Sequence, residues 1–428
     1  MSAESSKATG DGPGPGGVDE REQSTGPGSV AGVEVGGAWH ANLWLFLATL
    51  GSVFLTGIIN YNEVPEIKDA GFIDAIWLSL THQTAASLMR GAQFTGSLLT
   101  ILVAHELGHY IAARIHKVDA SLPFFIPMPI FSPFGTMGAV IRMRGLIPTR
   151  RALLDIGASG PLAGLAFAVP LYAWGVAHSE VVPLTGEIGA ELGESGLIRI
   201  LDHLFASATP EGMTILYSPV AFGAWGGFFV TMINLLPVGQ LDGGHVAYAL
   251  FGPKQDRYAR LVHQALLAFF FVSIVGHLGR DISAGRHITP VLMGRHVSNS
   301  IFWLFWFQVL AILGTLSSRS RADASSSSRR ETTEGGVLTI RTRLVAIVGL
   351  VVLASMAREH ASWPLVGGFF AGLGLLLAME VKGGVFRRHD LLDHPPTGSA
   401  PLDTGRKVIA IATLVIFALL FMPEPFSL

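Results

Sequence analysis

The chain has 428 residues, of which 50% are hydrophobic and only 14% are charged. Soluble domains usually carry about a quarter charged residues, and hydrophobic runs recur along most of this chain. Composition therefore favours one membrane-embedded body over a string of soluble domains. The net charge of −2 gives no reason to expect a nucleic-acid partner. The absence of cysteine excludes disulfides and thiolate chemistry, so any metal must be bound by His, Asp or Glu.

The first region, residues 1–38, is rich in Gly, Ser, Pro and charged residues. Such a stretch cannot bury enough apolar surface to offset the entropy lost on ordering, which predicts a disordered N-terminal tail. No hydrophobic stretch follows a basic start within the first 30 residues, so we do not expect a signal peptide there.

Nine apolar stretches follow the tail and predict an all-α polytopic membrane protein with about eight or nine transmembrane helices. Several are shorter than the ~20 residues that cross a bilayer without tilting, and the stretch from 343 to 380 could be a hairpin of two short spans. The predicted spans are 42–59, 93–115, 154–177, 217–236, 259–278, 299–317, 343–357, 363–380 and 406–422.

The charges on the connections predict the orientation of these spans. Arginine and lysine are concentrated at 116–151, 318–342 and 381–407, whereas the connection 178–215 carries mostly acidic residues. The positive-inside rule places the basic connections in the cytoplasm. Nine alternating spans then place the N-terminus inside and the C-terminus outside.

The connection 121–144 reads SLPFFIPMPIFSPFGTMGAVIRMR. Its four prolines, at positions 123, 127, 129 and 133, exclude a regular helix there. From Gly135 to Arg144 the pattern suits a short β-strand or hairpin. Apolar chain that is not helical must be shielded from lipid by protein, so we expect a small membrane-associated β region here.

An HExxH motif, His105-Glu106-Leu107-Gly108-His109, lies inside the span 93–115. Residues four apart share one helix face, so His105 and His109 can bind one zinc ion together. Glu106 can reach a metal-bound water, whose pKa zinc lowers to ~7, and act as its general base. Ionisable residues in one turn of a membrane helix are costly and indicate a functional site. The alternative is a polar helix face that lines a water-filled groove.

A catalytic zinc usually takes three protein ligands plus water. The best candidate for the third ligand is Asp242, in the segment NLLPVGQLDGGH at 234–245. This segment ends the span 217–236 on the same predicted side of the membrane as HExxH. Pro237 and Gly239 break the helix, so the chain is unwound where a ligand has to be directed. The alternative for Asp242 is an ordinary helix cap.

Other polar and small residues allow more than one interpretation. Asn234 could donate a hydrogen bond to a developing oxyanion, or join two helices of the bundle. His245 could be a further ligand or proton donor, but a local hydrogen-bonding role is favoured. The stripe GASGPLAG at 157–164 predicts close packing against the HExxH helix. The remaining histidines are interpreted as interfacial or loop residues, among them His263, His277, His287, His296, His389 and His394.

Taken together, these features resemble the site-2 protease family of intramembrane zinc metalloproteases. The matching segments are HELGH at 105–109, FGTMGAVIRMR at 134–144, GASGPLAG at 157–164 and NLLPVGQLDGG at 234–244, in the family's order. The resemblance covers about residues 90–250, and the tail HPPTGSAPLDTGRK at 394–407 is similar to the end of some prokaryotic members.

The resemblance implies a three-helix metalloprotease core in which His105, His109 and Asp242 hold Zn2+. It implies that Glu106 is the general base and that Asn234 assists at the oxyanion. The implied activity is hydrolysis of peptide bonds in or near transmembrane segments of membrane-tethered proteins, in regulated intramembrane proteolysis. The strand region at 134–144 would pair with an unwound substrate segment.

On this interpretation the chain divides into four parts: a disordered tail (1–38), a first span with an extracytoplasmic segment (39–92), the catalytic core (93–250) and additional helices with cytoplasmic loops (251–428). The active site would face the cytoplasmic side, and the expected partners are a membrane-tethered substrate and the lipid bilayer. A membrane zinc transporter or metal-binding membrane protein is the alternative, although transport does not require a glutamate beside the ligands. A catalytically silent scaffold of the same fold is a third hypothesis.

Overall fold

The computed structural model describes residues 38–61, 72–129, 132–143, 147–184, 191–325, 338–360 and 362–427. The predicted disordered tail, residues 1–38, lies almost entirely outside these residues, as does Arg144 at the end of the predicted strand region.

Helices dominate the described residues, and each of the nine apolar stretches corresponds to one long helix. These helices are α1 (Ala38–Asn60), α3 (Ala85–Ile115), α4 (Arg150–Ala177), α6 (Pro219–Asn234), α8 (Gln255–Ser283), α9 (Pro290–Ser325), α10 (Ile340–His360), α11 (Trp363–Gly383) and α12 (Thr404–Leu420). Three shorter helices lie between them: α2 (Phe72–Thr81), α5 (Gly196–Phe205) and α7 (Asp242–Phe251).

Among the residues that the structure describes, six helical segments are long and apolar enough to cross a bilayer, which confirms a mostly helical, multi-pass membrane protein. They are Trp39–Asn60, Arg150–Ala177, Asp242–Ser283, Pro290–Ser318, Ile340–His360 and Trp363–Gly383. The count of eight or nine spans stays a prediction. Helices α6 and α12 have only 16 and 17 residues, fewer than the ~20 that cross untilted, and α3 carries several ionisable residues.

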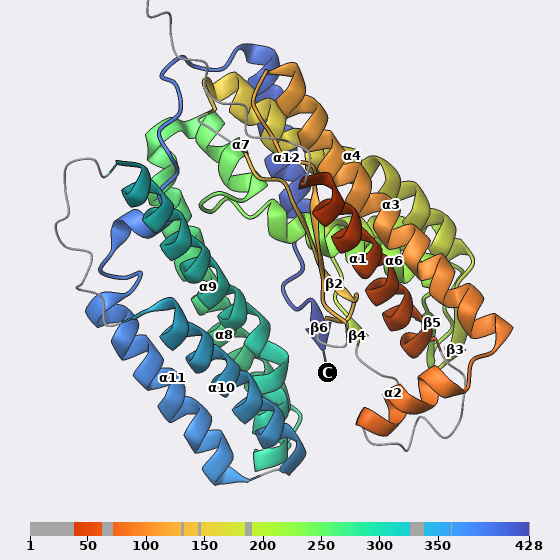
Figure 1. Ribbon diagram of the computed structural model, residues 1–428. Coiled ribbons are helices and arrows are strands. Elements are labelled where there is room, and N and C mark those ends of the chain that lie inside the picture. Colours follow the sequence, from red (N-terminus) through yellow and green to blue (C-terminus); the bar gives the residue numbers. More distant parts are fainter. Residues whose placement is uncertain are drawn as a thin grey trace, which may run out of the picture.

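The helices form two groups (Figure 1). The core bundle contains α1, α3, α4, α6, α7 and α12, and the second bundle contains α8 to α11. Small residues bring α3, α4 and α6 close together within the core bundle. A Cβ on Gly223 of α6 would lie 2.8 Å from the Phe94 carbonyl of α3, and one on Gly175 of α4 would lie 2.4 Å from the Ala221 nitrogen of α6. Such close approach is how membrane helices gain packing energy.

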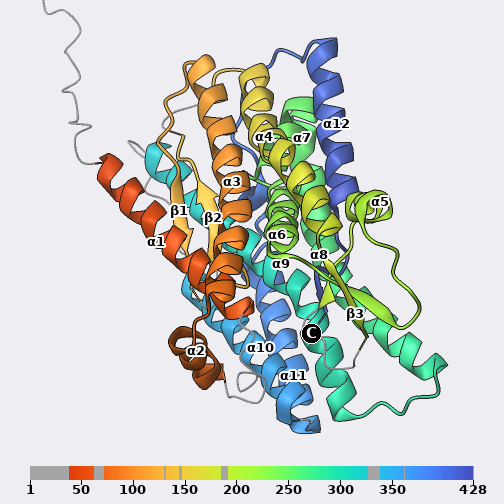
Figure 2. The ribbon, with the colours of Figure 1, turned by 90° about the vertical axis from the view of Figure 1, so that its right-hand side faces the viewer.

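The predicted β region is a hairpin along α1 (Figure 2). Strand β1 (Phe124–Pro127) pairs antiparallel with β2 (Thr136–Val140), with Phe124 opposite Val140. Helix α1 holds the segment before β1, because the Asn42 amide donates hydrogen bonds to two backbone carbonyls there, at 3.0 and 2.8 Å. The hairpin confirms the strand predicted after Gly135, which adopts φ +74° at the turn.

The acidic connection after α4 forms a small cap. Strand β3 (Glu180–Pro183) pairs with β5 (Met213–Leu216), and β4 (Glu191–Leu192) pairs with β6 (Phe426–Ser427) near the end of the chain. Helix α5 (Gly196–Phe205) follows β4 and precedes β5 along the chain. Its Asp202 accepts a hydrogen bond of 2.8 Å from the Tyr172 hydroxyl of α4. The cap therefore connects the ends of α4, α6 and α12 on the side that the charges predict to be extracytoplasmic.

Candidate metal centre

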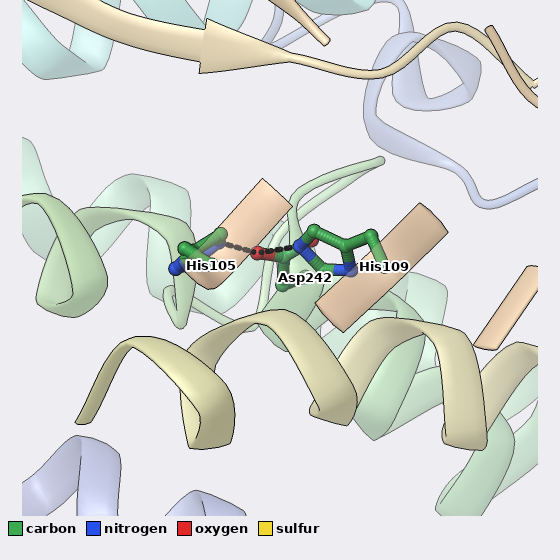
Figure 3. A group of neighbouring side chains, drawn as sticks. All are labelled: His105, His109 and Asp242. Carbon is green, nitrogen blue, oxygen red and sulfur yellow. Dashed lines mark hydrogen bonds and ion pairs between the residues drawn. The ribbon is translucent and has the colours of Figure 1, made fainter. Parts of the chain in front are cut away.

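Three side chains from two helices meet at one point in the core bundle (Figure 3). The Nε2 atoms of His105 and His109 lie 3.1 and 3.2 Å from the Oδ2 atom of Asp242. All three potential ligand atoms lie within 4.8 Å of one another. The structure thus brings together the residues that the sequence assigned to metal binding.

The helical spacing of α3 places the two histidines together, and a tight turn before α7 brings Asp242 to them. His105 and His109 are one turn apart on α3 and are buried. Asp242 is the first residue of α7, directly after an irregular segment in which Gly239 has φ +56°. A Cβ on Gly243 would lie 1.9 Å from the Leu235 carbonyl, so the glycine after Asp242 lets α7 start close to the end of α6.

The small-residue stripe of α4 makes room for the two histidines. A Cβ on Gly160 would lie 2.1 Å from the Nε2 atom of His109, and one on Gly164 would lie 3.3 Å from the Cβ of His105. On the facing helix, a Cβ on Gly108 would lie 2.5 Å from the Ser159 carbonyl. The predicted close packing of this stripe is confirmed, and its glycines also leave space for the imidazole rings.

The orientation of His109 is set from behind by α4. Its Nδ1 atom lies 2.7 Å from the Ile156 carbonyl, which can only accept, so Nδ1 carries the proton. In neutral His109 the Nε2 lone pair then faces a carboxylate oxygen of Asp242. Two acceptors at this distance require a proton or a cation between them, and an Nδ1–H bound to a carbonyl is the usual arrangement of a metal-ligating histidine. The donor set therefore fits a metal ion.

Glu106 and Asn234 also reach this site. Glu106 is buried next to His105 on α3. The Asn234 amide, at the end of α6, donates toward Nε2 of His105 at 3.4 Å. This contact joins α6 to α3, as the helix–helix hydrogen bond considered from the sequence requires, and it places the Asn234 amide beside a candidate ligand. The catalytic roles of both residues stay predictions.

Sequence reasoning missed the supports around the site. The Asp155 carboxylate, one residue before Ile156, accepts hydrogen bonds from Arg406 of α12 at 3.0 and 2.7 Å. It also lies 2.8 Å from Nε2 of His116, at the end of α3. The likeness of the tail 394–407 to other family members was the one signal in the sequence that this segment matters.

Comparisons with known proteins agree with this geometry. The sequence profile of peptidase family M50 matches residues 93–273. The Arabidopsis thaliana protein named "Probable zinc metalloprotease EGY2, chloroplastic" is 33% identical over 232 residues, which are 49% of this chain and 40% of that protein. Its namesake from Oryza sativa subsp. indica is 33% identical over 254 residues, 55% of this chain and 44% of that protein.

A third relative, EGY1 of Arabidopsis thaliana, is 30% identical over 221 residues, 49% of this chain and 39% of that protein. The chain thus spans less than half the length of the relatives it matches. No solved structure matches the chain.

Proposed function

We propose that the chain, whose residues 93–273 match the profile of peptidase family M50, is an intramembrane zinc metalloprotease that hydrolyses peptide bonds in or near transmembrane segments of membrane-tethered proteins. The observation that carries the proposal is the convergence of two imidazole nitrogens on one carboxylate oxygen, at 3.1 and 3.2 Å, beside a buried glutamate. Two His and one carboxylate are a usual ligand set of catalytic zinc.

His105, His109 and Asp242 would hold the zinc ion, which supplies Lewis acidity that makes water a competent nucleophile near neutral pH. The Ile156 carbonyl keeps the His109 ring oriented for this role. Glu106 would take a proton from the attacking water on its carboxylate and return it to the leaving amine. Asn234 would donate its amide hydrogen to the oxyanion that develops on the scissile carbonyl.

We further propose that the substrate enters as an extended segment beside β2. Helix α1 lies along β1, whereas within the described part of the chain β2 pairs only with β1. The second edge of β2 can therefore accept an added strand. An extended substrate also exposes a peptide bond that an intact transmembrane helix would hide.

The charge distribution supports an active site toward the cytoplasmic side. His105 and His109 lie in the last third of α3, which leads into the basic connection 116–151. The supports of the site, Arg406 and His116, lie at this same end of the helices. The positive-inside rule predicts that this face is cytoplasmic.

Replacement of Glu106 by Gln tests the mechanism. It keeps all three ligands but removes the base, so we expect cleavage of a reporter transmembrane substrate to fall ~10²–10⁴-fold. Zinc content, measured on the same purified protein, should remain stoichiometric. The matched control is Glu359→Gln, an exposed glutamate at the end of α10, which should cleave like the parent.

Two results would reject the proposal. If the Glu106→Gln variant cleaved the substrate at the parental rate, Glu106 could not be the general base. Zinc flux into proteoliposomes by the parent, without any proteolysis, would instead support the transporter hypothesis.

A further inference from the structure

Helix α7 carries Asp242 at its first position but has little stability of its own. It has only ten residues, and its N-cap, Leu241, makes no side-chain capping hydrogen bond. Isolated helices of this length are marginal in water even with good sequences, so packing partners must fix the place of α7. Those partners then determine where the Asp242 carboxylate lies relative to the two histidines.

The partner at the far end of α7 comes from the start of α4. The Arg150 guanidinium donates hydrogen bonds of 2.9 Å to the carbonyls of Ala249 and Leu250, which are among the carbonyls left free at a helix C-terminus. Arg150 therefore fixes the C-terminal turn of α7, which lies about two turns from Asp242. The position of the N-terminal half of α7 must depend on other contacts.

The middle of α7 packs closely against Gly157 of α4 and also contacts His394, from the connection between α11 and α12. Nε2 of His394 lies 2.7 Å from Nδ1 of His245, and the His394 ring stacks on Tyr248 with ring centroids 4.2 Å apart. His245 and Tyr248 follow Asp242 by three and six residues, so His394 contacts two successive turns of α7. His394 itself is 6% exposed.

His394 is in turn fixed by its own surroundings. Its backbone N–H donates to the Asp256 carboxylate of α8 at 3.0 Å. Its Nδ1 lies 2.7 Å from the Pro395 carbonyl, which can only accept, so Nδ1 carries a proton. In the neutral ring Nε2 is then the acceptor, and His245 donates its Nδ1–H to it. These bonds select one orientation for both rings.

We propose that His394 is a positioning residue for the metal centre, which fixes Asp242 through its contacts with His245 and Tyr248. This proposal rests on the proposed function, because it assigns His394 to the same zinc site from a position 152 residues further along the chain. Partners behind the ligands of a metal typically change metal affinity or activity ~10–100-fold when they are removed.

The experiment compares two variants of the full chain in detergent or proteoliposomes. His394→Phe keeps a ring to stack on Tyr248 but removes the acceptor for His245, whereas His394→Gln retains an acceptor in its amide oxygen. We expect His394→Phe to raise the dissociation constant of zinc ~10–100-fold and to lower kcat, with KM within about twofold of the parent. His394→Gln should recover most of both losses. The matched control is His287→Phe, in the exposed connection between α8 and α9.

Zinc affinity is measured by chelator competition and expressed per folded molecule. Parental zinc affinity in folded His394→Phe would overturn the proposal, and so would His394→Gln that is as impaired as His394→Phe. The proposal would also be overturned if His394→Phe lowered the fraction of folded protein while the folded molecules kept parental zinc affinity. A parent that binds no zinc would reject the proposed function and this proposal with it, whereas the first three results reject the role of His394 alone.

Discussion

The core bundle and the second bundle both bury ionisable side chains between membrane helices, but they satisfy them differently. In the second bundle the Arg343 guanidinium of α10 bonds the Glu380 carboxylate of α11, and both side chains are almost fully buried. Glu380 also accepts a hydrogen bond of 2.9 Å from the Val385 backbone N–H. In the core bundle, the His109 lone pair and the Asp242 carboxylate face each other as two acceptors.

This difference separates a structural ion pair from a metal centre. A guanidinium and a carboxylate neutralise each other's charge, whereas facing acceptors require a proton or a cation between them. Ionisable residues at membrane depth are often taken as functional sites by default. Here it is the shared direction of the lone pairs, rather than the burial of charge, that distinguishes the site.

The largest effect is expected from breaking the pair in the second bundle. Arg343→Met leaves the Glu380 carboxylate buried without its partner, which should lower the free energy of unfolding by about 3–5 kcal/mol. The double variant Arg343→Met with Glu380→Met should be close to the parent in stability, because neither charge remains. Unfolding in detergent measures both. If the double variant lost zinc while remaining folded, the pair would belong to the site and the comparison would fail.

A smaller effect is expected from filling the space beside the Nε2 atom of His109. In Gly160→Ala the new Cβ would lie 2.1 Å from the His109 Nε2 atom, so either the ring or helix α4 must move. We expect zinc affinity to fall ~10–100-fold, as when other supports of a metal ligand are disturbed. Gly96→Ala on α3 is the control, because its Cβ would meet nothing within 4 Å. Parental zinc affinity in Gly160→Ala would show that α4 can retreat without moving the ligand.

The parts of the molecule that local sequence determines were predictable. Apolar stretches gave the nine long helices, prolines and Gly135 gave the hairpin, and the four-residue spacing of His105 and His109 gave the ligand pair. Asp242 was predictable as a third candidate ligand because it follows a broken helix and was expected at the same side of the membrane as the HExxH motif. The HExxH motif determined the local geometry of the two histidines, whereas the number of spans stays a prediction.

The supports of the site were not predictable, because they depend on backbone acceptors and on distant contacts. The Ile156 carbonyl that orients His109 has no side-chain signal at all. The interpretation of the isolated histidines as interfacial or loop residues was wrong for His263, which is buried in the second bundle and bonds the Phe307 carbonyl at 2.8 Å. A lone histidine in an apolar helix gives no indication of which neighbouring carbonyl it will find.

The smallest effect is expected at Asp202 in the cap, a partly buried acid whose partners are two tyrosine hydroxyls. Burial raises the pKa of its carboxyl above the ordinary value of 3.8, although hydrogen bonds from Tyr172 and Tyr217 lower it in part. Since the folded state binds this proton more tightly, the stability it contributes is fully present below pH 3.8 and is lost as the pH rises through the raised pKa.

Asp202→Asn does not titrate but keeps an oxygen to accept from Tyr172. The variant should therefore show a flatter dependence of unfolding midpoint on pH above about 3.8 than the parent. Glu211→Gln, which replaces an exposed acid of the same connection, is the matched control. Parallel curves for the parent and Asp202→Asn would mean that the tyrosine hydroxyls compensate the burial fully. The Asp202 carboxyl, like that of Glu380 in the second bundle, would then be compensated by groups of the chain itself. Of these three acids, Asp242 would be the one that requires a cation or a proton from outside the chain.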